Sequence, residues 1–156
     1  QTMKTIILTL SILCSALTLA AQPRTEQTAR QEAMDFLREE GYLPKLDEDG
    51  DIFFKIQGAN YFVLLESQSD GSVYLNFMTL YGTDQPYEKI LEGCNSMNEQ
   101  KRVTKFIALK EEDGSTAYRI TYESFCNPED DFTQLLRDAI ALLPECVSEC
   151  IDKYEE

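Results

Sequence analysis

The chemistry open to this chain is limited by the absence of histidine from its sequence. Histidine is the usual general base of Ser-His-Asp and Cys-His nucleophile systems and a common zinc ligand. The seven glycines stand singly, so the chain has no glycine-rich phosphate loop. Cysteines and carboxylates are therefore the groups left to examine.

Cys146 and Cys150 are the residues that a thiol-redox function would use. Their spacing is not the Cys-x-x-Cys of a thioredoxin-like site. Glu145 and Glu149 lie beside them and should raise the thiol pKa, which disfavours a reactive thiolate. We expect no redox activity, and a small cell-envelope thiol protein is the first alternative function.

Two acidic clusters invite a metal or a hydrolytic interpretation. Counted as an EF-hand loop from Asp47, the sequence places isoleucine where the obligatory glycine belongs and glycine where the bidentate acid belongs. Asp130 and Asp131 could serve a carboxylate-dependent hydrolase, the second alternative function. Adjacent acids at a helix start point apart, however, and the helix dipole explains them. The sequence predicts no catalytic residue, no metal site and no cofactor.

Residues 1–21 have the layout of a secretory signal peptide with two residues upstream of it. Met3-Lys4 form a positive start, residues 6–19 form an apolar stretch, and the small Ala20-Ala21 follow. The apolar stretch is shorter than the roughly 20 residues of a membrane span. We expect Met3 to be the natural start, cleavage after Ala20 or Ala21, and a periplasmic or secreted protein. The alternative is a buried N-terminal helix.

Export would place the remaining cysteines in an oxidising compartment. Cys126 and Cys146 are separated by about 16 helical residues, or roughly 24 Å, which is too far for a disulfide. Pairing Cys94 with Cys126 and Cys146 with Cys150 is then consistent. A bond between helical residues four apart is strained, so the sequence leaves open the alternative that Cys146 and Cys150 are free buried thiols.

The charge of the chain bears on its partners. The chain has 28 acidic and 14 basic residues, for a net charge of −14. So negative a surface argues against nucleic acid and anionic membrane as partners. Residues 22–156 fit a single domain, with no membrane association expected once the signal is removed.

The central feature is residues 51–80, which read as three consecutive antiparallel strands. Their apolar and aromatic runs are separated by Gly58-Ala59-Asn60 and by the Asp70-Gly71 turn. Further strands are predicted over 102–110 and 116–125. Helices are predicted over 25–40, over 87–98, and from about 128 to the end with a kink at Pro144. The predicted order is α-β-β-β-α-β-β-α, an α+β domain with five strands.

Both faces of the predicted sheet are apolar, whereas a sheet with one solvated face should alternate more cleanly. One interpretation is that helices 25–40 and 128–154 cover one face and helix 87–98 covers the other, which leaves a monomer. The other is that part of the sheet forms a dimer or client surface, for which the candidate residues are Phe53, Tyr61, Val63, Tyr74 and Met78.

Three segments resemble the YbjN family, whose members are described as sensory-transduction regulators and share the fold of the type III secretion chaperones. They are LREEGYLPKLDEDGDIFFKIQGANYFVLLES (37–67), NSMN (95–98) leading into 103–109, and PEDDF (128–132). The resemblance covers nearly all of residues 22–156. It implies a twisted five-stranded antiparallel sheet with flanking helices, a homodimer, and the binding of a protein or peptide without catalysis. The signal-like segment and the four later cysteines depart from the family pattern.

Overall fold

The computed structural model describes residues 23–154, so the signal-like segment lies outside the described residues. The elements are, in chain order, α1 (Glu26–Glu39), β1 (Lys45–Leu46), β2 (Ile52–Ile56), β3 (Ala59–Ser67), β4 (Val73–Thr83), α2 (Tyr87–Gln100), β5 (Thr104–Lys110), β6 (Thr116–Cys126) and α3 (Phe132–Tyr154). None of the described helices combines the length and apolar character that crossing a membrane requires.

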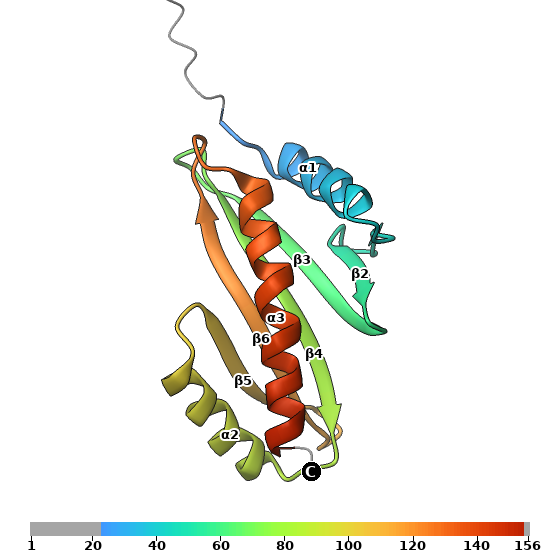
Figure 1. The fold of residues 1–156 in the computed structure, drawn as a ribbon, viewed down its shortest axis with the longest axis vertical. Helices are drawn as coiled ribbons and strands as arrows, with labels where there is room; N and C mark the ends of the chain where they lie inside the picture. Colours follow the sequence, from blue (N-terminus) through green and yellow to red (C-terminus); the bar gives the residue numbers. More distant parts are fainter. Residues whose placement is uncertain (1–22, 155–156) are drawn as a thin grey trace, which may run out of the picture.

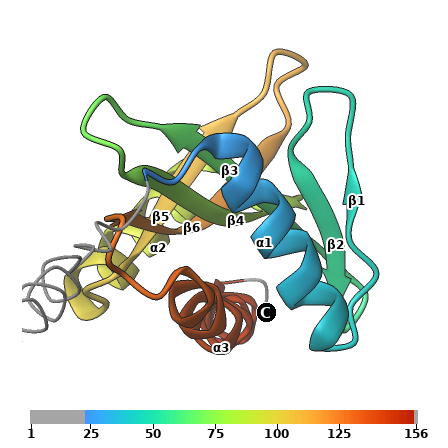
Figure 2. The ribbon, with the colours of Figure 1, turned by 90° about the horizontal axis from the view of Figure 1, so that it is seen from above.

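The six strands form one antiparallel sheet in the order β1-β2-β3-β4-β6-β5. The long strands β4 and β6 lie at its centre and pair over their full lengths. All three helices lie on one side of this sheet (Figures 1 and 2): α3 runs along β4 and β6, α1 lies over β3, and α2 packs beside β5. The other side carries no helix of residues 23–154.

The hydrophobic core lies between this sheet and the helices. Strand residues alternate in orientation, so every second residue of β2, β3, β4 and β6 enters it. Phe54, Tyr61 and Phe77 form an aromatic cluster there, with ring centroids 5.8 to 6.2 Å apart. Leu136 and Leu143 of α3 are fully buried against the same side of the sheet.

The predicted element order is confirmed, with one correction. The sheet has six strands in place of the predicted five, because Lys45 and Leu46 pair with β2 as a short edge strand. Two residues between Pro44 and Asp47 are too few to show alternation. α3 continues through Pro144 as one helix, and the kink expected there stays a prediction.

Arg24 fixes the leader before α1 to the end of the sheet at which β6 ends. Its Nη1 donates to Cys126 Sγ at 3.0 Å and to the Asn127 carbonyl at 3.2 Å. Its Nε pairs with Glu32 at 3.3 Å, and its guanidinium lies 5.4 Å from the centre of the Phe132 ring. One side chain thus links the leader, α1, β6 and α3.

The free edge of β5 is covered by a side chain of α2. Asn98 Nδ2 donates to the Phe106 carbonyl at 2.9 Å, and the Phe106 N–H donates to Asn98 Oδ1 at 2.9 Å. The amide therefore takes the place of a neighbouring strand at this position. Covering an edge in this way protects the strand from pairing with other chains.

Replacing Asn98 by alanine should remove both bonds and leave the Phe106 backbone without these partners. We expect the free energy of unfolding to fall by about 0.5–1.5 kcal/mol, measured by urea denaturation, because Asn98 is exposed and water can replace part of both bonds. Asn95→Ala, an exposed position on the same helix, should change it by less than about 0.5 kcal/mol. Equal effects of the two variants would show that the Asn98 bonds do not stabilise the edge.

Candidate interaction surface

The side of the sheet that faces away from the helices, called here the open face, is rich in exposed and half-exposed apolar side chains. Phe125 and Leu80 are 59% and 47% exposed. The apolar residues of the open face, assigned by alternation and strand register, are Phe53, Phe62, Leu64, Tyr74, Met78, Leu80, Ile107, Leu109 and Phe125. Large apolar side chains gathered on one exposed face of a domain mark an interaction site more often than isolated ones do.

The structure divides the five candidate residues predicted from the sequence between the two faces. Phe53, Tyr74 and Met78 lie on the open face, with Phe53 packed on Phe62 at 5.5 Å. Tyr61 and Val63 lie on the covered face, where they are 2% and 1% exposed beneath the helices. Their assignment to the candidate surface is therefore wrong, because β3 is apolar on both faces and its sequence does not show which side the helices take.

The interpretation in which α2 covers the second face is also wrong. Ile90, Cys94 and Met97 of α2 are buried, but α2 packs against β5, α3 and β6 on the same side as the other helices. The open face is thus left without cover by any of the described helices. The doubly apolar pattern in the sequence therefore does not come from helices on both faces.

At the centre of the open face a carboxylate is held by several neighbours. Glu123 is ion-paired with Lys105, and Thr121 donates to Glu123 Oε1 at 2.9 Å. Burial would raise the pKa of Glu123, but hydrogen bonds from Lys105, Tyr74 and Thr121 outweigh it and lower the pKa. Burial, together with the hydrogen bond to Glu123, raises the pKa of Tyr74 to about 12. At neutral pH Glu123 is therefore ionised and Tyr74 is uncharged.

The lowered pKa of Glu123 predicts a pH-dependent stability. Its carboxylate stabilises the folded chain above the ordinary value of 4.5, and this contribution disappears as the pH falls through the lower folded pKa. Wild type should exceed Glu123→Gln in unfolding free energy by about 1 kcal/mol at neutral pH. Denaturation at a series of pH values should show this difference shrinking below 4.5; a constant difference would contradict the lowered pKa.

Two polar atoms of the open face are buried without a hydrogen-bond partner: Asn76 Oδ1 on β4 and Arg119 Nε on β6. Asn76 lies opposite Glu123 and Arg119 lies opposite Leu80 in the strand register, so both belong to the central strand pair. Within residues 23–154, Arg119 makes no ion pair. A buried polar atom without a partner costs about 1–3 kcal/mol, and a bound ligand can recover this energy.

Two hollows are lined by residues of the open face. One, of about 360 Å³, includes Leu43, Phe53, Lys45 and Lys55 at the β1–β2 side. The other, of about 390 Å³, includes Tyr74, Phe125, Arg102 and Lys105 at the β4–β6–β5 side. Each therefore combines an aromatic ring with two basic side chains. Glu123 also lines the second hollow, where it is paired with Lys105.

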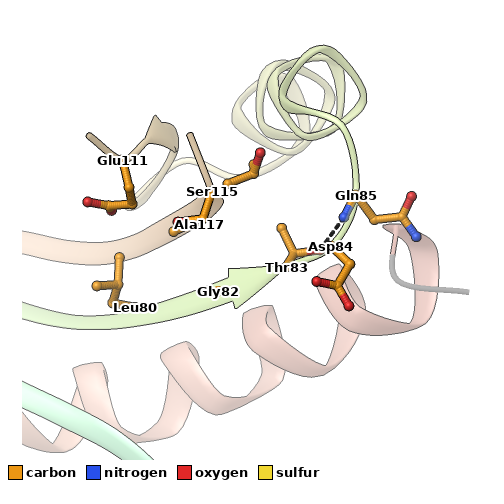
Figure 3. A pocket seen from close by; sticks show the side chains of 9 residues that line it. Leu80, Gly82, Thr83, Asp84, Gln85, Glu111, Ser115 and Ala117 are labelled. Carbon is orange, nitrogen blue, oxygen red and sulfur yellow. Dashed lines mark hydrogen bonds between the residues drawn. The ribbon is translucent and has the colours of Figure 1, made fainter. Parts of the chain in front are cut away.

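A third hollow, of about 720 Å³, lies where β4 ends and β6 begins (Figure 3). Asp84 and Glu111 come from opposite sides of it, and their carboxylates do not point toward each other. The Gln85 N–H donates to Thr83 Oγ1 at 3.1 Å, which fixes the turn that forms its rim. Two separated acids in an open hollow do not form the acid–base pair that a hydrolase needs.

The other carboxylates considered from the sequence have local structural roles. Asp131 Oδ1 accepts from Thr133 Oγ1 at 2.8 Å and from the Gln134 N–H at 3.2 Å, which caps the start of α3. Asp47 Oδ1 accepts from the N–H groups of Asp49 and Asp51 at 3.0 and 2.9 Å within a turn. No group of three or more potential metal ligands gathers in the described part of the chain. These observations give the hydrolase and calcium interpretations no support.

The disulfide pairing expected from the sequence is wrong: Cys94, Cys126, Cys146 and Cys150 are all free and buried. Cys126 ends β6 beside Arg24, whereas Cys94 lies in α2 near the opposite end of the sheet (Figure 1), so these two cannot meet. The alternative in which Cys146 and Cys150 are free buried thiols agrees with the structure. The sequence spacing excluded a bond between Cys126 and Cys146. It could not show where α2, which carries Cys94, lies in the fold.

The buried thiols are poor nucleophiles. Burial raises the pKa of Cys94 to about 11 and also raises the pKa values of Cys126 and Cys146. For Cys146, Glu149 and Glu145 add to the effect of burial, while Thr104 and Lys101 oppose it. The thiol-redox alternative therefore lacks the exposed, low-pKa thiolate that it requires.

A thiol titration tests this. At pH 8 the native protein should react with a colorimetric disulfide reagent at least about 100-fold more slowly than the unfolded chain, because burial both raises the thiol pKa and blocks access. In guanidinium chloride the chain is unfolded, and every cysteine thiol should then react at once. Two thiols of the native protein that react rapidly and cycle between oxidised and reduced forms would restore the redox alternative.

Comparison with known proteins identifies the fold. No family model matches the chain, and no curated protein matches it. The crystal structure of YbjN from E. coli, a proposed transcription regulator, matches over 85% of this chain and 92% of that chain with a TM-score of 0.58 and 11% identity. The chain has a YbjN-like fold. The identity is too low for this match to show more than the fold, and the fold expected from the resemblance is confirmed.

Arg119 and Asn76 are the residues of the open face that the sequence analysis did not select. A signal was present: Arg119 interrupts an apolar stretch of strand and shares the alternation of Thr121 and Glu123. An arginine within a strand is usually solvated on an outer face. Only the structure shows that its Nε is buried without an acceptor.

Proposed function

We propose that this chain is a non-enzymatic module that binds a protein or peptide on the open face of its sheet. The observation that carries the proposal is an apolar strand surface, including Phe125 and Leu80, that none of the described helices covers. The YbjN-like fold supports it, since the solved neighbour is itself described as a regulator. No cofactor is part of the proposal.

Affinity capture with matched surface variants tests the binding role. Wild-type protein and Phe125→Ser are used to capture partners from the source cells, with Leu91→Ser as the control because Leu91 is an exposed apolar residue of α2. Loss of an aromatic contact at an interface should weaken binding by about 10-fold or more. The proposal predicts that capture fails with Phe125→Ser and persists with Leu91→Ser. Equal capture by all three proteins would contradict it.

Export is a further part of the proposal, and it is supported by the signal-like layout of residues 1–21. The mass of the protein purified from its source cells should correspond to a chain that begins near Gln22. Because Cys14 would then be absent, the unfolded protein should titrate four thiols in place of five. A mass that includes the signal-like segment would contradict export.

The resemblance also implies a homodimer, so a second copy of the chain is the competing occupant of the open face. A second copy would use the same open face, since β5 is covered at its edge by Asn98 and β1 is only two residues long. Light scattering of wild type and Phe125→Ser tests this. A dimer that becomes a monomer in the variant would support self-association through the open face, and a monomeric wild type would contradict it.

A further inference from the structure

The charges of the open face differ from those of the rest of the chain. Its strand residues include four bases, Lys45, Lys55, Lys105 and Arg119, but only two acids, Glu66 and Glu123. The whole chain has 28 acids against 14 bases. The open face thus reverses the overall ratio, and one of its two acids is already paired with Lys105. Such a surface attracts a negatively charged partner.

Arg119 shows where a negative group would bind, because its side chain is only partly buried and makes no ion pair within residues 23–154. Arg119 Nε lacks an acceptor, and a guanidinium fits the two oxygens of a carboxylate better than any other anion that a protein surface commonly presents. Asn76 Oδ1 lacks a donor and lies on the adjoining central strand. It can accept an N–H from the backbone of the same bound segment. A carboxylate-bearing peptide thus supplies both missing partners.

The two hollows determine the size of the occupant. They lie on either side of β3 and β4, three strand spacings of about 4.8 Å apart across the sheet. Phe53 is level with Met78 in the strand register, whereas the second hollow reaches Tyr74, so the centres of the hollows are separated by roughly 15–20 Å. Each combines an aromatic ring with two bases. A small carboxylic acid could occupy only one of them. An extended segment that carries acidic and apolar side chains can span both, and it would cross the central strands β4 and β6, the second of which carries Arg119.

We propose that the partner presents an acidic, partly apolar segment, one carboxylate of which binds Arg119. This inference rests on the proposed binding function and adds the chemistry of the partner. A second copy is a poorer fit, because its open face would bring the same excess of bases against this one. Like charges at an interface disfavour association.

A displayed library of random linear peptides, selected on the immobilised full chain, tests the inference. The selected pool should be enriched in aspartate and glutamate interspersed with aromatic and aliphatic residues. The most enriched peptide is then synthesised, and its affinity is measured by fluorescence anisotropy for wild type, Arg119→Gln, Arg119→Lys and Arg38→Gln. Arg38 is the control because it is a surface arginine that pairs with Asp35 on α1.

Arg119→Gln should weaken binding at least about 10-fold, the effect of losing one charge-assisted contact. Arg119→Lys should be intermediate, because a lysine keeps the charge but not the planar fork. Arg38→Gln should stay within about twofold of wild type. Enrichment of basic or uncharged peptides, the absence of any enrichment, or equal effects at Arg119 and Arg38 would overturn the inference.

The two proposals can fail separately. If capture from cells depends on Phe125 but the selected peptides are not acidic, the binding function stands and the proposed partner chemistry is wrong. If the only bound species is the chain itself, with a dimer in light scattering, the open face binds a second copy and the acidic-segment inference is again wrong. If neither Phe125→Ser nor Arg119→Gln affects any interaction, both proposals are wrong.

Discussion

Replacing Phe77 by alanine should lower the free energy of unfolding by about 3–5 kcal/mol. Phe77 lies on β4, is fully buried, and packs with Phe54 and Tyr61 beneath the helices. Removing its ring leaves a cavity that the surrounding side chains can fill only in part. A loss of this size is a large share of the stability of a typical domain, and urea or thermal denaturation would detect it directly.

The matched control for this experiment is Phe125→Ala, the same substitution on the open face. Phe125 is 59% exposed and touches mainly Tyr74, with ring centroids 5.3 Å apart. Its replacement should cost less than about 1 kcal/mol, because little apolar area leaves a buried environment. If the two variants lost similar stability, the sheet would be covered on both faces, and the open face would not be available for a partner.

The second large effect is expected for Arg24→Ala, at about 2–3 kcal/mol. The variant loses the bonds to Cys126 and to the Asn127 carbonyl, the ion pair with Glu32, and the contact with the Phe132 ring. The carbonyl of Asn127 and the packing around Phe132 then lose a charged partner that water can replace only in part. Thermal denaturation should show a lower Tm for this variant.

Arg38→Ala is the control for Arg24→Ala, since its pair with Asp35 on α1 is exposed and lies within one helix. Such pairs contribute at most about 0.5 kcal/mol. The expected result is a clear loss for Arg24 and almost none for Arg38. An Arg24→Ala protein as stable as wild type would mean that the leader is not fixed to the end of the sheet.

Local patterns in the sequence predicted most of the fold. Turns at Asp70-Gly71 and at Asp113-Gly114-Ser115, together with the alternation of Ile52, Phe54 and Ile56, were enough to place the main hairpins. The side chains at these positions have the orientation that the alternation predicts. What the sequence missed locally was β1, because a two-residue strand carries no periodic signal.

The faces of the sheet could not be assigned in the same way. β3 is apolar on both sides, so nothing in its sequence distinguishes Tyr61, which the helices bury, from Phe62, which they leave on the open face. Only the positions of the helices settle the matter, and these are set by contacts between segments far apart in the chain, such as those of α1 with β3 and of α2 with α3. The same long-range contacts decide that Cys94 and Cys126 remain apart.

The binding atoms of the site were harder to predict than its apolar surroundings. Phe53, Tyr74 and Met78 were identified because large apolar residues on a second face need an explanation. Arg119 and Asn76 were missed because their importance lies in what they lack, a partner for one buried atom each. A missing hydrogen bond has no sequence signature, since the residue type is ordinary in a strand.

Site-specific photo-crosslinking in the source cells tests the central claim most directly. A photoreactive amino acid is placed at Phe125 on the open face and, as a control, at Leu91 on α2, since both side chains are exposed and apolar. The account predicts that the probe at position 125 crosslinks to a single protein partner, through a segment rich in acidic and apolar residues, while the probe at position 91 does not. Crosslinking of the partner from position 91 alone would contradict the account and place the binding surface on the helices.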